Sequence, residues 1–206
     1  MIRTWTIPRI WDNDDCIIIG GGPSVNFIDL ECLRHKRVLA VNCAYRKTLW
    51  ADVMFFGDPG WHKAYGQKLN EFGGLVVTRQ IECRDMPGIR VVRFTDARFG
   101  ISTQRDLLIW NKSSGACAIN LAYLLGAGRI ILVGFDMKVV NGEANYHKLY
   151  PRKCNARAKV DNRWKRFLEP FPAIKKDLDA LAVPCLNATP DSALTAFPMV
   201  KLEDVL

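Results

Sequence analysis

The sequence feature that most constrains the fold is a series of short apolar runs separated by helical or turn-rich stretches. Strands that are covered on both faces produce continuous apolar runs of this kind, whereas half-exposed strands produce strict alternation. Because these runs alternate with helical patterns, the chain is predicted to be an α/β protein with a single Rossmann-like domain. Its sheet is expected to be doubly wound and mostly parallel, with helices on both faces. The seven predicted strands are residues 16–20, 37–42, 52–58, 74–79, 89–94, 129–135 and 183–187.

Apolar residues at helical spacing predict helices between these strands, over residues 26–34, 114–126 and about 160–182. The last segment is expected to break into two helices, because Pro170 and Pro172 interrupt it.

Length and composition favour one globular domain spanning residues 1–206, since 49% of the residues are hydrophobic and 24% are charged. No apolar run approaches the roughly 20 residues that cross a bilayer, and the N-terminus has no apolar signal-peptide core. The seven cysteines are scattered singly, which indicates reduced thiols and argues against a disulfide framework or a zinc site. We therefore expect a cytoplasmic protein without membrane partners.

The positive charge is unevenly distributed. The chain carries a net charge of +8, and residues 138–166 contain nine basic and two acidic residues, which leaves +7 in that segment. Such a patch attracts a polyanion or a phosphorylated ligand, although a solvated helix face explains it equally well. Residues 136–160 lack periodicity and are expected to form a long, basic, lid-like loop.

Three consecutive glycines follow the first predicted strand directly. Gly20, Gly21 and Gly22 are followed by Pro23 and Ser24, which lead toward a helix. In an open α/β sheet ligands bind beyond the carboxyl ends of the strands, where glycine N–H groups can contact a phosphate. Ser24 can cap the helix or bind the same phosphate. The triplet therefore predicts a phosphate cradle or, in the simpler interpretation, a turn.

Polar residues end several other strands at the same edge of the predicted sheet. Asn42, Asp58 and Asp136 each follow an apolar run, and Ser114 and Gly115 begin a helix. Each residue taken alone is explained by a helix cap or a turn. Together they predict a nucleotide-binding edge.

His147 is the histidine best placed for catalysis. It lies in "NGEANYHKLYP", within the basic loop that follows Asp136. An imidazole is the side chain best suited to take a proton at neutral pH, although an isolated loop histidine is more often structural.

Six stretches carry a resemblance to a known group: "IIIGGGPSV", "AVNCAY", "ADVMFFGDPGW", "SSGACAINLAYLLGAGRIILVGFDM", "NYHKLYP" and "LNATPDSALTAFP". They resemble the MptE-like Rossmann-type domains, including a set encoded by phages and prophages. If a phage encodes this chain, the resemblance implies that the expected compartment is the cytoplasm of the host. Their order is similar to that of the bacterial sialyltransferases of glycosyltransferase family 42. The likeness runs from about Cys16 to the C-terminus.

The resemblance to the sialyltransferases implies roles for individual residues. Gly21, Gly22, Ser24 and Asn42 would hold the nucleotide of a CMP-sugar, and the helix start at Ser114-Gly115 would lie near the donor.

In the loop after Asp136, the resemblance implies that Tyr146 binds the leaving phosphate and that His147 is the general base. The chain departs from the sialyltransferases in two places: they have asparagine in place of Gly21, and a tyrosine in place of Met137-Lys138. Lys138 or Lys148 could neutralise the leaving phosphate instead.

Three functions follow from these observations. The first is a glycosyltransferase that uses a nucleotide-sugar as co-substrate and a glycan or nucleic acid as acceptor, with His147 as base. The second is the ATP- and Mg²⁺-dependent pyrophosphokinase reaction that the MptE branch implies, in which Asp58 and Asp136 are the carboxylates available for a metal. The third is a nucleic-acid-binding or DNA-modifying phage protein that uses the basic segment.

Overall fold

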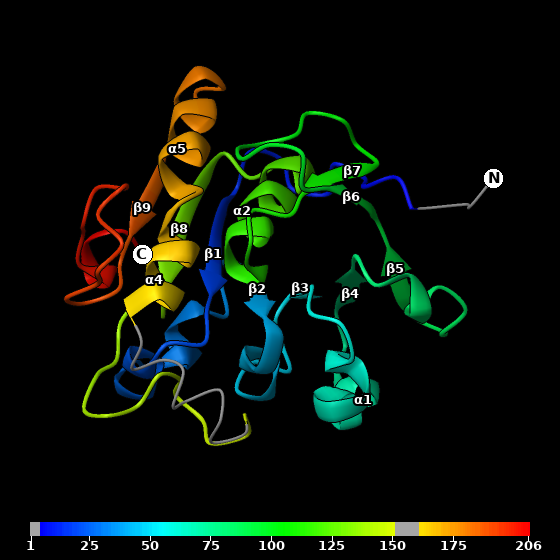
Figure 1. The fold of residues 1–206 in the computed structure, drawn as a ribbon, viewed down its shortest axis with the longest axis horizontal. Coiled ribbons are helices and arrows are strands. Elements are labelled where there is room, and N and C mark those ends of the chain that lie inside the picture. The colour runs from blue at the N-terminus through cyan, green and yellow to red at the C-terminus, as the bar shows by residue number, and fades with distance from the viewer. Residues whose placement is uncertain (1–4, 151–160) are drawn as a thin grey trace.

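The computed structural model describes residues 5–150 and 161–206. Its centre is a seven-stranded, all-parallel sheet with the order β5-β4-β3-β2-β1-β8-β9 (Figure 1). The predicted α/β class with a parallel sheet is confirmed, and each of the seven apolar runs supplies one strand of this sheet. The strands are β1 (Asp15–Ile19), β2 (Arg37–Val41), β3 (Val53–Phe56), β4 (Leu75–Thr78), β5 (Ile89–Val91), β8 (Arg129–Val133) and β9 (Cys185–Asn187).

The strand order reverses beside β1. The chain builds outward from β1 through β2, β3 and β4 to β5, and then returns to place β8 on the other side of β1. In the register, Ile17 lies opposite Val38 of β2 and Ile131 of β8. A reversal of this kind opens a crevice at the carboxyl ends of the two diverging strands, which is where α/β sheets bind ligands.

Both faces of the sheet are buried, which explains why the strands are continuously apolar. Ile18 and Leu39 face the side covered by α2 (Ser114–Leu125) and α5 (Phe171–Ala180). Ile17 and Val38 face the opposite side, which is covered by short 3₁₀ helices and loops. Since successive side chains of a strand point to opposite faces, each run contributes to two hydrophobic cores.

Two of the three helix predictions are confirmed. Helix α2 begins after Ser113, whose side chain accepts a hydrogen bond from Ala116 N–H, and it ends at Gly126 in the left-handed region (φ 107°). The amphipathic segment divides as expected into α4 (Asp161–Leu168) and α5, with Pro170 directly before α5.

The helix predicted over residues 26–34 is wrong. Two 3₁₀ helices, η1 (Pro23–Phe27) and η2 (Leu30–Leu33), take its place. Ile28 and Asp29 between them have extended backbones, and the Asp29 side chain accepts from Glu31 N–H, which starts a new turn. Phe27, one of the apolar residues at helical spacing in this segment, is 80% exposed.

The remaining elements lie outside the main sheet. The apolar run at residues 89–94 divides between β5 and β6 (Arg93–Thr95), and β6 pairs with β7 (Leu107–Ile109) in a second, two-stranded sheet. The strand β7 was not predicted, because its three apolar residues form too short a run. The other helices are α1 (Trp61–Tyr65), η3 (Asn42–Arg46), η4 (Gly66–Glu71), η5 (Ile81–Cys83) and η6 (Leu202–Asp204).

Within the described residues, none of the helices is both long and apolar enough to cross a membrane. The predicted basic loop is described as far as Tyr150, where its backbone is irregular apart from a bridge between Val140 and Glu143. Residues 151–160 of that loop lie outside the described part of the chain.

Candidate functional site

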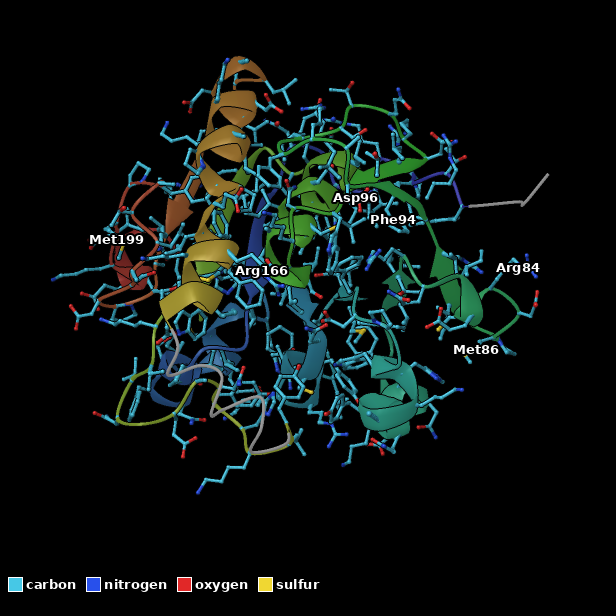
Figure 2. All side chains as sticks on the ribbon, in the orientation of Figure 1. Arg84, Met86, Phe94, Asp96, Arg166 and Met199 are labelled. Carbon is cyan, nitrogen blue, oxygen red and sulfur yellow. The ribbon has the colours of Figure 1, made fainter. Side chains whose placement is uncertain are left out.

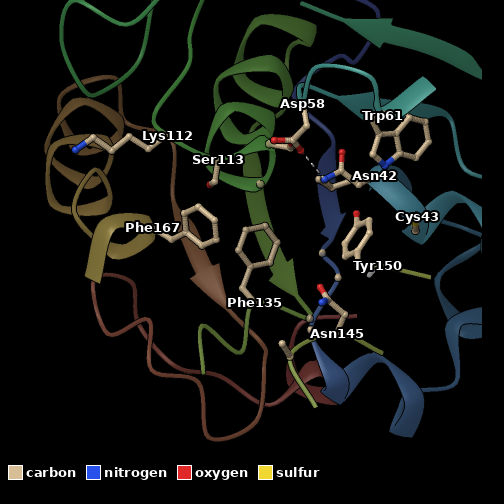
Figure 3. A pocket seen from close by; sticks show the side chains of 18 of the residues that line it. Asn42, Cys43, Asp58, Trp61, Lys112, Ser113, Phe135, Asn145, Tyr150 and Phe167 are labelled. Atoms are coloured by element: carbon tan, nitrogen blue, oxygen red, sulfur yellow. Dashed lines mark hydrogen bonds between the residues drawn. The ribbon is translucent and has the colours of Figure 1, made fainter. Parts of the chain in front are cut away.

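A cavity of about 800 Å³ lies at the carboxyl ends of five neighbouring strands (Figure 3). It is lined by Gly20 after β1, Asn42 after β2, Asp58 after β3, Arg79 after β4 and Asp136 after β8. These residues are far apart in the sequence, and the parallel sheet gathers them at one edge.

Nine of the twelve residues predicted for the site line this cavity. Ser24, Tyr146 and Lys138 do not line it. The nine are Gly20, Gly21, Gly22, Asn42, Asp58, Ser114, Gly115, Asp136 and His147.

Two glycines of the triplet are required by the neighbouring strand end, and the predicted phosphate cradle is therefore largely occupied by the protein itself. A Cβ at Gly20 would lie 2.6 Å from the Gly134 carbonyl oxygen, and one at Gly22 would lie 1.8 Å from an Asp136 carboxylate oxygen. The Gly20 and Gly22 N–H groups already donate to the carbonyls of Val133 and Gly134.

Gly21 differs from its two neighbours. A Cβ at this position would have its nearest contact at 3.6 Å, on Asn145 Oδ1. Within residues 5–150 and 161–206 its N–H makes no hydrogen bond, while its carbonyl accepts from Tyr146 N–H at 3.0 Å. Gly21 is thus the glycine of the triplet whose N–H remains available to a ligand.

Asp136 holds the glycine loop in place. Its carboxylate accepts hydrogen bonds from Ser24 N–H at 3.1 Å and from the Ser24 hydroxyl at 2.8 Å. The residue is only 2% exposed, and this burial raises the pKa of Asp136 despite the two hydrogen bonds. The Ser24 side chain thus binds Asp136 and does not cap η1, while its predicted contact with a phosphate stays a prediction.

Asp58 is the centre of a hydrogen-bonded group at the entrance to α2. Its Oδ2 accepts from the Ser114 hydroxyl at 3.0 Å and from Asn42 Nδ2 at 3.3 Å, the bond drawn in Figure 3. The Ser114 hydroxyl in turn accepts from Gly57 N–H at 3.2 Å. Both bonds to Asp58 use one oxygen, so Oδ1 keeps its full capacity to accept a proton or a hydrogen bond.

Two buried amide atoms of the cavity wall have no partner. Asn42 Oδ1 and Asn145 Nδ2 are buried and make no hydrogen bond within the described residues. Asn42 is also held in the left-handed region (φ 52°), with its Nδ2 directed to Asp58. A buried polar atom without a partner is costly, and such atoms at a cavity point to a ligand that completes them. Asn145 was missed because it lies in the loop, and no local pattern marks it.

His147 lines the cavity, and a backbone N–H donates a hydrogen bond to its ring. Its Nδ1 accepts from Leu149 N–H at 3.2 Å. Burial, together with the positive charge of Arg46, lowers the pKa of His147 to about 4, so the ring is neutral at pH 7. A neutral imidazole that accepts at Nδ1 carries its proton on Nε2. In this arrangement His147 therefore offers a donor at Nε2, whereas a general base needs a lone pair there.

Tyr150 lines the cavity, whereas Tyr146, the tyrosine named in the sequence analysis, does not. The Tyr146 hydroxyl donates to the Cys43 carbonyl, and burial raises the pKa of Tyr146. Tyr150 lines the cavity beside Asn42 and Cys43, and its ring packs edge-on against His147 with centroids 4.7 Å apart (Figure 3).

Arg79 is a lining residue that the sequence analysis overlooked. Its guanidinium lies between the rings of Phe94 and Trp110, and its Nε donates to the Gly57 carbonyl at 2.8 Å. Burial lowers the pKa of Arg79, which nevertheless keeps its charge at any physiological pH. The cue was available, since Arg79 ends an apolar run at the same edge as Asn42 and Asp58.

The carboxylates of the cavity bear on the ATP- and Mg²⁺-dependent alternative. Within residues 5–150 and 161–206, no three His, Cys, Asp or Glu side chains gather closely enough to hold a metal ion. For the Mg²⁺ of the ATP-dependent alternative, Asp58 is the lining carboxylate that remains open, since Asp136 is bonded to Ser24. Much of the predicted nucleic-acid-binding segment falls in residues 151–160, outside the described part of the chain.

No protein-family model matches this chain, and no curated protein or solved structure gives a significant match. The class of protein that the fold defines is an α/β protein with a Rossmann-like, all-parallel sheet.

Proposed function

We propose that this chain is a nucleotide-dependent transferase, and that it moves a sugar from a nucleotide-sugar to a hydroxyl acceptor. The observation that carries the proposal is the single cavity of about 800 Å³ that joins aromatic, cationic and carboxylate side chains at the carboxyl edge of the sheet. Its size suits a nucleotide-sized ligand. The proposal includes a doubly wound, single nucleotide-binding domain and the relationship to the MptE-like and sialyltransferase groups.

The lining supplies the contacts that a nucleotide-sugar needs. Tyr150 and Trp110 offer aromatic surface for a base and a sugar, and Arg79 and Arg166 offer positive charge for phosphate. The open amide atoms of Asn42 and Asn145 add one acceptor and one donor for directed hydrogen bonds.

Asp58 is the proposed general base. In the reaction the acceptor hydroxyl gives its proton to Asp58 Oδ1, and its oxygen forms the new bond to the anomeric carbon. The bond from that carbon to the phosphate oxygen breaks, and its electron pair leaves with the nucleotide. Asn42 and Ser114 hold Oδ2, which fixes the orientation of the carboxylate for this transfer.

His147 is assigned the role of a hydrogen-bond donor, which revises its predicted role as base. Its neutral ring offers Nε2–H to the leaving phosphate or to the sugar, because Leu149 N–H occupies Nδ1. A donor of this kind stabilises negative charge as it develops on the leaving group.

Release of nucleotide from a panel of CMP-, UDP-, GDP- and TDP-sugars tests the proposal, with binding measured by calorimetry on the same samples. Asp58→Asn is expected to lower kcat about 100-fold or more while donor affinity stays close to that of the unchanged chain. Asp85→Asn is the matched control, since the Asp85 side chain is 87% exposed and pairs with the adjacent Arg84.

The role of His147 is tested by His147→Gln, because glutamine can donate a hydrogen bond but cannot take a proton. We expect His147→Gln to keep most of the activity that His147→Ala loses; equal loss in both variants would restore His147 as the base. Failure of every sugar nucleotide to bind or to be cleaved would contradict the proposed function. Formation of AMP from ATP would establish the pyrophosphokinase instead.

A further inference from the structure

Three contacts hold the guanidinium of Arg79 in the wall of the cavity. Its guanidinium carbon lies 4.1 Å from the ring centre of Phe94 and 3.9 Å from that of Trp110. Stacking between two aromatic rings fixes the plane of the guanidinium. The bond from Nε to the Gly57 carbonyl then fixes its rotation within that plane.

The two Nη groups are the donors that this arrangement leaves open. Across residues 5–150 and 161–206, neither Nη of Arg79 makes a hydrogen bond or an ion pair. Lys112, which lines the same cavity, is different, because its ammonium pairs with Glu169 at 2.6 Å. Arg79 thus presents a preoriented fork of donors, and such a fork matches two oxygens of one phosphate group.

The Gly57 peptide links this fork to the start of α2. Its carbonyl accepts from Arg79, and its N–H donates to the hydroxyl of Ser114, the first residue of the helix. A Cβ at Gly57 would lie 2.2 Å from the Trp110 ring, so only glycine lets the ring reach Arg79 here. Arg79 and the positive end of a 12-residue helix therefore occupy neighbouring positions on one wall.

A second arginine faces the same cavity from another element. Arg166 extends from α4, and it is a lining residue with an exposed side chain (Figure 2). Two arginines and a helix N-terminus carry more positive charge than one phosphate monoanion needs, while Asp58 is the open carboxylate among them.

We propose that Arg79 is a specificity-determining residue that binds the second phosphate of a diphosphate, so that the donor is a nucleoside diphosphate sugar. This inference rests on the proposed function and deepens it. The first phosphate binds near Gly21 and the start of α2, and the second binds the Nη fork of Arg79. A nucleoside monophosphate sugar fills the first position and leaves the fork empty.

Calorimetry with matched pairs of ligands tests the inference without any variant. The complete chain is titrated with UDP and UMP, GDP and GMP, CDP and CMP, and ADP and AMP at one fixed salt concentration. For the preferred base, we expect the diphosphate to bind about tenfold or more tightly than the monophosphate, as one charge-assisted bidentate contact implies.

Variants then assign that preference to Arg79. Arg79→Gln is expected to reduce the ratio of diphosphate to monophosphate affinity to about one, with monophosphate affinity unchanged. Arg79→Lys keeps the charge but not the stacked fork, and it should retain only part of the ratio. Arg84→Gln removes the same charge from an exposed turn remote from the cavity, and it should leave the ratio intact (Figure 2).

The outcomes separate this inference from the proposed function. If no nucleotide binds, the proposed function fails and the inference falls with it. If mono- and diphosphates bind equally, or if Arg79→Gln leaves their ratio unchanged, Arg79 only supports the fold and the transferase proposal stands. If Arg79→Gln weakens only a nucleotide-sugar whose sugar carries a carboxylate, Arg79 binds that carboxylate and the diphosphate assignment is overturned.

Discussion

The two ends of the parallel sheet treat their polar side chains differently. At the amino end, charged groups bind one another: Asp15 accepts from Arg129 Nε at 2.8 Å and from its Nη2 at 2.6 Å, and Lys36 lies 3.3 Å away. Asp14 similarly accepts from Arg37 at 2.8 Å. At this end the polar groups satisfy each other, and they serve the fold.

At the carboxyl end, comparable groups are left incomplete. Asn42 Oδ1 and Asn145 Nδ2 are buried without a partner, and the Nη groups of Arg79 make no bond in the described part of the chain. Folded proteins usually leave few buried polar atoms without a hydrogen bond. Several such atoms around one cavity therefore point to a ligand that supplies the missing hydrogen bonds. Asp136 is the exception at this end, because both of its carboxylate oxygens accept hydrogen bonds from Ser24.

The largest effect on stability is expected at the glycine loop, which gives the most direct test of the difference between the two ends of the sheet. Gly22→Ala would place a Cβ 1.8 Å from Asp136 and 2.6 Å from the Gly134 carbonyl. We expect it to lower the free energy of unfolding by about 3 kcal/mol, because the loop must move away from β8. Urea denaturation measures this loss.

Gly21→Ala is the matched control for that experiment. Its Cβ would meet nothing closer than 3.6 Å, and we expect the free energy of unfolding to change by less than about 1 kcal/mol. Equal losses in the two variants would show that the loop is not divided between a structural and a ligand-facing glycine.

These glycines show where sequence reasoning stops. The apolar runs located all seven strands of the main sheet, because a strand buried on both faces has little freedom of composition. Three glycines after a strand, however, form the same sequence pattern in two cases. They can make room for a ligand or for the end of the neighbouring strand. Only the pairing of β1 with β8 shows that Gly20 and Gly22 make room for Gly134 and Asp136.

Lining residues that directly follow a strand could be predicted from the sequence. Those whose role depends on contacts with distant segments could not. Asn42 and Asp58 were predicted because they follow apolar runs. The same rule identifies Arg79, although its importance depends on Phe94 and Trp110, which come from other segments. The tautomer of His147 depends on one backbone N–H, which no sequence pattern encodes.

The next largest effect on stability is expected at Asp136, the carboxylate at the carboxyl end of the sheet that is bonded to Ser24. Asp136→Ala would leave the Ser24 N–H and hydroxyl without their acceptor, and we expect a loss of about 2 kcal/mol in the free energy of unfolding. Asp136→Asn keeps an acceptor and should lose less. A larger loss in Asp136→Asn would contradict the bonding described for Ser24.

The pH dependence of stability should have opposite signs at the two ends. Burial raises the pKa of Asp136, so its carboxylate lowers stability as the pH rises above the ordinary aspartate value of 3.8. Hydrogen bonds from Arg129 lower the pKa of Asp15, so its contribution is present above 3.8 and is lost as the pH falls below it. Unfolding of Asp136→Asn and Asp15→Asn between pH 3 and pH 7 measures both slopes; slopes of the same sign would refute the contrast.

Arg129→Gln should have a smaller effect on stability, and this effect should be confined to the amino end of the sheet. The pair with Asp15 is bidentate but partly exposed, with 36% and 23% of the two side chains accessible. We therefore expect a loss of about 1 kcal/mol in unfolding free energy and no change in nucleotide affinity. A loss of nucleotide affinity in this variant would mean that the two ends are coupled through β1 and β8.

Asn145→Ala should have the smallest effect on stability and thereby sharpens the contrast most. Its Nδ2 is buried without a partner among the described residues, so the truncation removes an unsatisfied donor along with some packing. We expect the free energy of unfolding to change by less than about 0.5 kcal/mol, while nucleotide affinity falls about tenfold. Denaturation and calorimetry on the same preparation measure the two quantities. If stability falls and affinity does not, the amide serves the fold, and the carboxyl end is no more incomplete than the amino end.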